Sequence, residues 1–373
     1  MNDCAMVTVP CLVTVAAGVL APGHLGELTR YLPFELADDV LESTRTVQRR
    51  MRALPSRVGI YFVLAMVLFP GIGYLRVWDK MTAALEGLGL PRPSEKALRD
   101  LRRRLGPAPV RALFETVAVP LASPRVPGVA YRGLLGAVIG GKGERSEVPL
   151  ARKLVPLLRE GMLLLADRAY DAADLLKEAA ATGAHVLVRG STARKPPAGE
   201  VLPDGSCLSR LDGLRVRIIE AALDVHGADG TRLGDGYRLI TTLLDWRRYP
   251  AGELVSLYHE RWEIEVAYLA LRHTLLGGYV LRSRDRAGAE QELWALLTVY
   301  QALRMAMVTA TGTVPGTDPD RASFTAALQP RGSRSSPRAA SKTPVTRATP
   351  AGSAAPSWPA CCLPGGHATA PGK

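Results

Sequence analysis

One segment, residues 252–277, combines an apolar helical surface with charged side chains, and this combination restricts the folds open to the chain. Apolar residues occupy most sides of the expected helix, which is typical of a protein interior. Tyr258, Arg261, Glu265 and Arg272 fall within about a 60° arc of that helix. Buried charges are unfavourable unless they are paired or bind a charged ligand. The segment therefore predicts either an internal ion network or a functional helix.

A second candidate site follows a short apolar strand, Met162–Ala166, which ends directly at Asp167. A continuous apolar run is typical of a strand buried on both faces of a sheet. The neighbouring segments show strand patterns at 133–140 and 185–188 and helix patterns at 146–160 and 171–182. That alternation predicts an α/β sheet. Because ligand sites lie at the carboxyl ends of such strands, Asp167 is a candidate catalytic or metal-ligating residue. The alternative is a helix cap, for which Asp171 is better placed.

Charge indicates an anionic partner such as nucleic acid, because the formal net charge is +12. Residues 330–373 carry six basic and no acidic side chains, which leaves +6 on residues 1–329. Helical periodicity dominates residues 22–122, where Ser94 is expected to cap a helix with one apolar face. The opposite surface of that helix carries Lys96, Arg99, Arg102, Arg103 and Arg104. This basic surface is either a DNA-backbone contact or a solvated face.

Several other classes of protein are disfavoured. Gly136–Gly143 matches the spacing of a phosphate-binding loop, but Gly143 stands where a Mg²⁺-binding Ser or Thr is required. The five cysteines form no CxxC pair and indicate free thiols in a reducing cytosol. The apolar run Val58–Phe69 is too short to cross a bilayer, and the N-terminal apolar stretch lacks a preceding basic region. We expect a cytoplasmic protein with no membrane partner.

The helix 252–277 resembles a family signature. Its spacing Tyr258-x2-Arg261-x3-Glu265-x6-Arg272 is similar to the Y-x2-R-x3-E-x6-K signature of type-four insertion-sequence transposases, with arginine in place of the final lysine. The run Asp167–Asp171, which includes Arg168, resembles the motif around their second catalytic aspartate. The resemblance covers residues 22–328.

This resemblance implies an α/β, RNase H-like catalytic domain with a β-rich insertion, preceded by a helical DNA-binding domain. Three carboxylates would hold two Mg²⁺ (or Mn²⁺) ions and cut and rejoin double-stranded DNA at terminal inverted repeats. Asp167 matches the second carboxylate and Glu265 the third. The phosphate-binding and supporting positions are then Tyr258, Arg261, Arg272 and Arg168. The resemblance also implies a homodimer on DNA and a nucleoid-associated location.

The first carboxylate of the family has no match. No aspartate occurs between Leu101 and Ala166. The fold needs three strands of about 5–6 residues each before its first helix, and only Gly133–Gly140 qualifies. We infer an internal deletion that joins Val129–Gly133 to the following residues, so we expect the sheet to lack its first strands. The composition changes abruptly after Leu328, which indicates an aberrant C-terminus.

The expected organisation has six parts. They are an N-terminal extension (1–21), a helical DNA-binding domain (22–122), the first part of the RNase H-like core (123–190), a β-rich insertion (191–246), the glutamate helix with C-terminal helices (247–328) and a disordered basic tail (329–373). The leading hypothesis is a degenerate transposase. The alternatives are a non-catalytic DNA-binding remnant and an unrelated hydrolase or nuclease.

Overall fold

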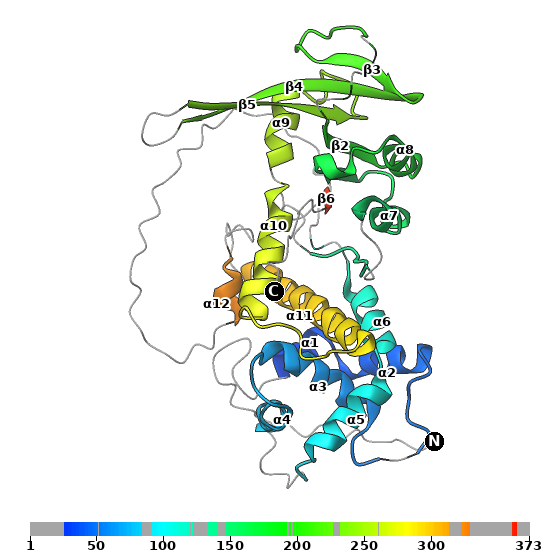
Figure 1. Cartoon of the computed structure of the whole chain (residues 1–373), viewed down its shortest axis with the longest axis vertical. Coiled ribbons are helices and arrows are strands. Elements are labelled where there is room, and N and C mark those ends of the chain that lie inside the picture. Colours follow the sequence, from blue (N-terminus) through cyan, green and yellow to red (C-terminus); the bar gives the residue numbers. More distant parts are fainter. Residues whose placement is uncertain are drawn as a thin grey trace, which may run out of the picture.

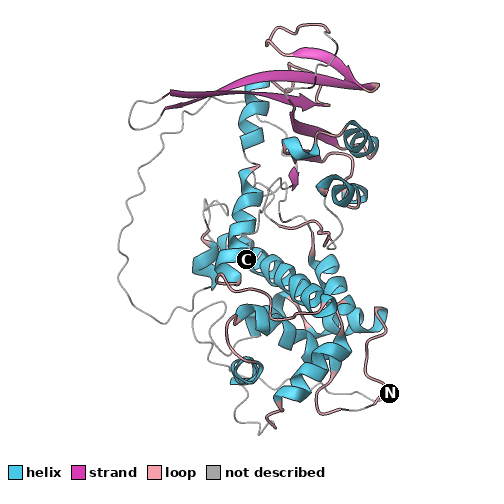
Figure 2. Cartoon of the chain, in the orientation of Figure 1, coloured by secondary structure: helices cyan, strands magenta, loops and turns pink. Residues whose placement is uncertain are grey.

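The protein has a helical body at one end and a mixed sheet at the other, joined by a column of helices (Figure 1). The computed structural model describes residues 26–50, 52–83, 91–119, 121, 133–140, 146–191, 194, 197, 199–226, 232–259, 261–312, 322–328 and 360–363. Figure 2 shows that helices dominate the lower half and strands the upper end.

The helical body is built around two apolar helices, α3 (Ser56–Leu68) and α11 (Arg286–Gly312), which pack against one core. Its other helices are α1 (Gly26–Tyr31), α2 (Phe34–Ser43), α4 (Tyr74–Thr82), α5 (Glu95–Leu105), α6 (Ala108–Val117) and α12 (Phe324–Leu328). The predicted cap of α5 is confirmed, because the Ser94 hydroxyl accepts a hydrogen bond from the Ala97 N–H at 3.2 Å. Residues from both ends of the described chain therefore share this core.

Helix α11 is long and apolar enough to cross a membrane by length and composition alone. However, 67% of its most apolar window is buried inside the molecule, where it packs against α3 and α6. Its composition is accounted for by this position at the centre of the helical body.

A buried polar network fixes α5 to α11. The Arg102 guanidinium lies 2.9 Å from the Glu292 carboxylate, and both side chains are 6% exposed. Arg102 also donates to the Gln291 side chain at 3.0 Å and to the Ser283 hydroxyl at 3.0 Å. Buried charges are tolerated when they are paired and hydrogen-bonded in this way.

The sheet has the strand order β3-β4-β5-β2-β1-β6. The strands are β1 (Leu163–Ala166), β2 (His185–Gly190), β3 (Cys207–Leu211), β4 (Leu214–His226), β5 (Arg232–Thr241) and β6 (Ala360–Leu363). Strand β1 is parallel to both β2 and β6, whereas the β2–β5, β4–β5 and β3–β4 pairs are antiparallel. The predicted α/β sheet with strands near 162–166 and 185–188 is confirmed.

Two apolar clusters cover the two faces of this sheet. One includes Leu164 and Val186 and packs under α8 (Ala173–Ala181) and beside α7 (Glu147–Arg152). The other includes Leu163, Leu165 and Leu187 and packs under α9 (Ala251–His259). The continuous apolar composition of β1 is explained by this burial on both faces.

Three expectations need correction. Residues 133–140 lie in no strand. The segment 252–277 is not one helix but α9, α10 (Trp262–Leu269) and a π-helical turn, Ala270–Leu275. The expected β-rich segment 191–246 does contain β3, β4 and β5, which continue the main sheet. The tail was expected to be disordered throughout, but residues 360–363 form β6. The expected turn at 228–230 lies outside the described residues.

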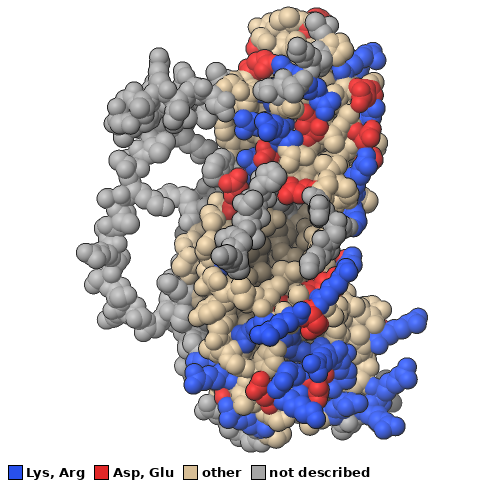
Figure 3. All heavy atoms as spheres, viewed as in Figure 1, with Lys and Arg blue, Asp and Glu red and all other residues tan. Residues whose placement is uncertain are grey.

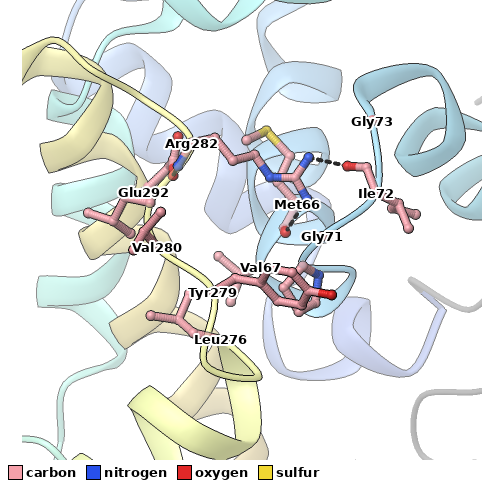
Figure 4. A pocket seen from close by; sticks show the side chains of 12 residues that line it. Met66, Val67, Gly71, Ile72, Gly73, Leu276, Tyr279, Val280, Arg282 and Glu292 are labelled. Carbon is pink, nitrogen blue, oxygen red and sulfur yellow. Dashed lines mark hydrogen bonds between the residues drawn. The ribbon is translucent and has the colours of Figure 1, made fainter.

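The far end of the helix column docks on the helical body. Arg282 donates hydrogen bonds to the carbonyl oxygens of Ile72 and, at 2.7 Å, of Phe69. Figure 4 shows Arg282 and Tyr279 reaching toward the loop after α3, around a cavity of about 340 Å³. Gly71 has a φ of +78° and faces the Tyr279 ring, where a side chain would collide with it. The column that carries Glu265 is thus held at both ends.

Candidate active site

Asp167 lies at the carboxyl end of β1, the position that the sequence predicted. It is half-buried, and its Oδ1 accepts a hydrogen bond from the Arg168 N–H at 2.7 Å, which starts the short 3₁₀ helix Arg168–Tyr170. Asp171, expected to cap the next helix, instead binds Arg194 at 3.2 Å and accepts from the Ser191 N–H. Asp167 therefore does cap a helix, although that helix is the short 3₁₀ turn and not α8. The second carboxylate oxygen of Asp167 makes no ion pair with the described residues.

Tyr258 connects α9 to the same strand end. Its side chain is 6% exposed, and its hydroxyl donates to the carbonyl oxygen of Ala166 at 3.2 Å. Burial raises the pKa of Tyr258 to about 12, so the hydroxyl stays a neutral donor. We expected this hydroxyl to contact a DNA phosphate. That contact stays a prediction, and the structure adds a bond from this hydroxyl to the strand that ends at Asp167.

Arg261 and Glu265 follow where the column changes from α9 to α10. The Arg261 guanidinium lies 5.8 Å from the Tyr258 ring centroid and 3.5 Å from the Glu265 carboxylate. The Glu265 side chain is 40% exposed, so this pair is weak. Consecutive contacts thus run from the Asp167 strand end through Tyr258 and Arg261 to Glu265. The expected internal network of Glu265 extends to Arg261 and not, among the described ion pairs, to Arg272.

The two remaining predicted side chains are exposed. Arg168 follows Asp167 in the 3₁₀ helix, and Arg272 lies in the π-helical turn beyond Glu265. The structure describes no ion pair for either residue. Both guanidiniums are therefore accessible to an anionic ligand.

Three further residues line this face, and sequence analysis missed them. Because Ala166 pairs with Val188, the next residues, Asp167 and Arg189, occupy equivalent places on adjacent parallel strands. The Arg189 guanidinium lies 5.5 Å from the Tyr237 ring centroid, and the Tyr237 hydroxyl is 3.2 Å from His259 Nε2. Arg189 follows the predicted strand 185–188, so the argument used for Asp167 could have found it, although β2 continues to Gly190.

Carboxylates of the described residues form no metal-binding cluster around Asp167. Among the described residues, no three His, Cys, Asp or Glu side chains gather closely enough to hold a metal ion. Glu147 approaches from α7, but it is hydrogen-bonded to Tyr170; burial and this carboxylate together raise the pKa of Tyr170. Within the described structure, neither Asp167 nor Glu265 belongs to such a group of three.

The basic surface of α5 is smaller than expected. Lys96, Arg99 and Arg103 are exposed, and Arg99 pairs with Glu95 at 3.5 Å. Arg102 was expected on this surface, but it is buried and bound to Glu292. The helix turns this arginine toward α11, so the prediction for Arg102 is wrong.

Arg104 is half-buried and joins a second basic segment. It donates to the Leu54 carbonyl oxygen at 2.7 Å, while its Nε is buried without a hydrogen-bond partner in the described structure. Burial lowers the pKa of Arg104, and the nearby charge of Arg52 lowers it further. Arg49 and Arg50 are exposed in the same loop. Figure 3 shows Lys and Arg gathered over the helical body.

Comparison with known proteins identifies the family. Residues 22–115 match the model of the N-terminal domain of insertion element 4 transposases, and residues 128–302 match the transposase DDE domain. The chain belongs to the type-four insertion-sequence family of DDE transposases. It is also 26% identical over 361 residues to the transposase InsG for insertion sequence element IS4 of Escherichia coli (strain K12), and the match covers 80% of each chain.

The two family matches assign the sheet and most of the helical body to different domains of the family. The DDE domain implies an RNase H-like fold for the sheet that carries Asp167. DDE transposases in general use divalent metals and act at the DNA ends of elements. The first family match lies on the helical body and the second on the sheet, the helix column and part of α11.

Proposed function

We propose that this transposase binds double-stranded DNA at the terminal inverted repeats of an insertion element but has lost the complete site for cutting it. The observation that carries this proposal is that no three His, Cys, Asp or Glu side chains of the described residues gather to hold a metal ion, although Asp167 and Glu265 stand at two of the family's carboxylate positions. The sequence supports it independently of the structure, since no aspartate occurs between Leu101 and Ala166. An internal deletion that removed the first strands would account both for the missing aspartate and for the missing metal-binding cluster.

The missing carboxylate matters because of the chemistry it would support. In a complete site, two Mg²⁺ or Mn²⁺ ions held by three carboxylates activate the attacking oxygen and stabilise the leaving oxygen. Asp167 and Glu265 supply two of those carboxylates. The present residues can still bind DNA: Arg168, Arg189, Arg261 and Arg272 offer guanidiniums to phosphate oxygens on the same part of the molecule.

The helical body supplies the larger DNA contact in this proposal. Its exposed basic groups are Lys96, Arg99 and Arg103 on α5 and Arg49, Arg50 and Arg52 in the loop after α2. Neighbouring like charges such as Arg52 and Arg104 repel each other unless an anion lies between them. A DNA backbone supplies such an anion. We further propose that two copies act together on two ends, which the mass of the DNA complex would measure.

The proposal is tested by separating binding from cleavage. Full-length protein is mixed with DNA carrying the element's terminal repeats, at several salt concentrations, with Mg²⁺ or Mn²⁺. We expect salt-dependent binding and no strand cutting. Robust cutting that disappears in Asp167→Ala and Glu265→Ala, but persists in Asp174→Ala, would show that the site is complete. Asp174 is the matched control because its side chain is 75% exposed in nearby α8.

A non-catalytic DNA-binding remnant and a degenerate transposase make the same prediction in that assay. They differ in origin, which the surrounding gene can decide. Flanking inverted repeats, with a second reading frame that continues the family pattern past Leu328, would support descent from a complete transposase. Their absence together with sequence-specific binding elsewhere in the genome would favour the remnant.

A further inference from the structure

Strand β1 is the strand that carries Asp167, and both of its edges are occupied. Leu163, Leu164, Leu165 and Ala166 are each no more than 2% exposed. On one side they pair in parallel with His185–Val188 of β2, and on the other with Ala360–Leu363 of β6. A buried strand needs hydrogen-bond partners for its N–H and C=O groups on both sides. Without β6, the outer edge of β1 would be open.

No earlier part of the described chain fills that edge. The segment that sequence analysis assigned to a strand, 133–140, makes no ladder with the sheet. The residues that do fill it, Ala-Cys-Cys-Leu, form a short apolar run within a tail rich in Pro, Ala, Ser and Arg. An apolar run is the composition that a parallel, buried position favours. The pairing covers all four residues of β1 in one continuous register.

We propose that Ala360–Leu363 is an intramolecular donor strand, which closes the edge of the catalytic sheet left open by the missing upstream strands. An open edge next to an apolar strand invites pairing with a second chain and aggregation. The donor strand satisfies the β1 backbone from within the same molecule. It does not restore the catalytic site, because residues 360–373 contain no Asp or Glu.

The proposal is tested by hydrogen exchange in the full-length chain and in a chain ending at Leu328. Amides of β1 that face β6 should exchange at least about tenfold faster in the shorter chain, a factor that corresponds to one or two net backbone hydrogen bonds. Amides in Leu214–Ile219 of β4 should keep their protection, which shows that the shortened chain is folded. Unchanged exchange in β1 at all protein concentrations would overturn the proposal.

Proline substitutions distinguish strand pairing from a general effect of the tail. Alternate N–H groups of an edge strand point toward its neighbour, and proline is tolerated only where the N–H points away. Of Cys361→Pro and Cys362→Pro, one should therefore accelerate β1 exchange as truncation does, and the other should do so much less. Full protection of β1 in both variants would contradict the proposal.

Addition of the segment in trans completes the test. A synthetic peptide spanning residues 356–367 should restore β1 protection to the shortened chain in a saturable manner, whereas the same peptide with proline at 361 and 362 should not. If β1 protection in the shortened chain instead rose with the concentration of that chain and did not respond to the peptide, the edge of β1 would be covered by a second copy. That result would overturn the proposal. These outcomes do not depend on DNA cleavage, so they are distinct from the test of the proposed function.

Discussion

Arg102 is a buried structural residue, although most of the basic residues beside it on α5 are exposed. Arg102 belongs to a run of basic residues on α5, yet it points into the protein and pairs with Glu292 at 2.9 Å. Glu292 also accepts hydrogen bonds from the Ser283 hydroxyl and the Arg282 N–H. A buried carboxylate with this many donors holds α5, α11 and the preceding loop together.

Removal of one partner should be strongly destabilising at this position. We expect Glu292→Ala to lower the free energy of unfolding by about 3–5 kcal/mol, because Arg102 would stay buried without a counter-charge. Chemical denaturation measures this change. The matched control is Glu115→Ala, since Glu115 pairs with Arg111 on the surface at 2.8 Å with both side chains more than half exposed. There the loss should not exceed about 1 kcal/mol, and an equal loss at both sites would contradict the assignment.

At the level of elements, α9 is anchored to the sheet by a second buried arginine. Arg217 on β4 is fully buried, pairs with Asp204 and donates to the Tyr249 carbonyl oxygen at 2.6 Å. Asp204 in turn accepts from the Ala251 N–H at 3.1 Å, at the first residue of α9. The start of α9 is thus set by the sheet, and α9 sets the position of Tyr258 against β1.

Because this anchor includes an ionised carboxylate, the free energy of unfolding should fall at acidic pH. Burial acts to raise the pKa of Asp204, but hydrogen bonds from Ser206 and Ala251 and the charge of Arg217 outweigh it, so the pKa is lowered. Because the pKa of Asp204 is lower in the folded state, its ionised form stabilises the fold at any pH above the pKa of the unfolded chain, about 3.9. This stabilisation is lost as the pH falls through the folded-state pKa.

Asp204→Asn should therefore remove part of the fall in unfolding free energy below about pH 4, as measured by denaturation across pH 2–7. Asp212→Asn, in the exposed turn between β3 and β4, is the matched control for loss of one carboxylate. If Asp204→Asn and Asp212→Asn gave the same dependence of unfolding free energy on pH, the charge of Asp204 would not contribute to the stability of the anchor.

At the scale of the whole molecule, exposed Lys and Arg side chains gather over the helical body (Figure 3), whereas Asp167 lies at the carboxyl end of β1 in the sheet. The column α9–α10 and the π-helical turn connect them, and Arg282 fixes the column's lower end to α3. A DNA molecule that contacts both parts would be positioned by the body and presented to the sheet. Binding should then survive damage to the catalytic carboxylates.

Loss of phosphate contacts on the helical body should change the salt dependence of DNA binding. We expect the double variant Arg52→Ala/Arg103→Ala to bind every DNA sequence more weakly and to reduce the slope of log affinity against log salt by about one for each lost contact. Titrations at several salt concentrations measure that slope. Arg210→Ala, an exposed arginine of β3, is the control and should leave the slope unchanged; an equal effect would place the DNA contact on the sheet.

Sequence alone determined the features that depend on local pattern. Apolar runs identified β1 and the buried centre of β2, Val186–Val188, because residues that face both apolar layers of a sheet are mostly apolar. Ser94 identified the start of α5, and the end of β1 identified Asp167. The spacing of Tyr258, Arg261 and Glu265 identified the family, because it matches the family signature position by position.

Tertiary structure decided the features that depend on distant partners. Arg102 is buried because Glu292, far along the chain, faces it, and no local pattern encodes that pairing. The Tyr258 hydroxyl bonds the carbonyl oxygen of Ala166 because α9 lies directly over β1. The four residues of β6 become a strand only because β1 offers an open edge beside them. Burial and hydrogen-bond pairing are properties of the folded neighbourhood, and these contacts join segments that composition and periodicity treat separately.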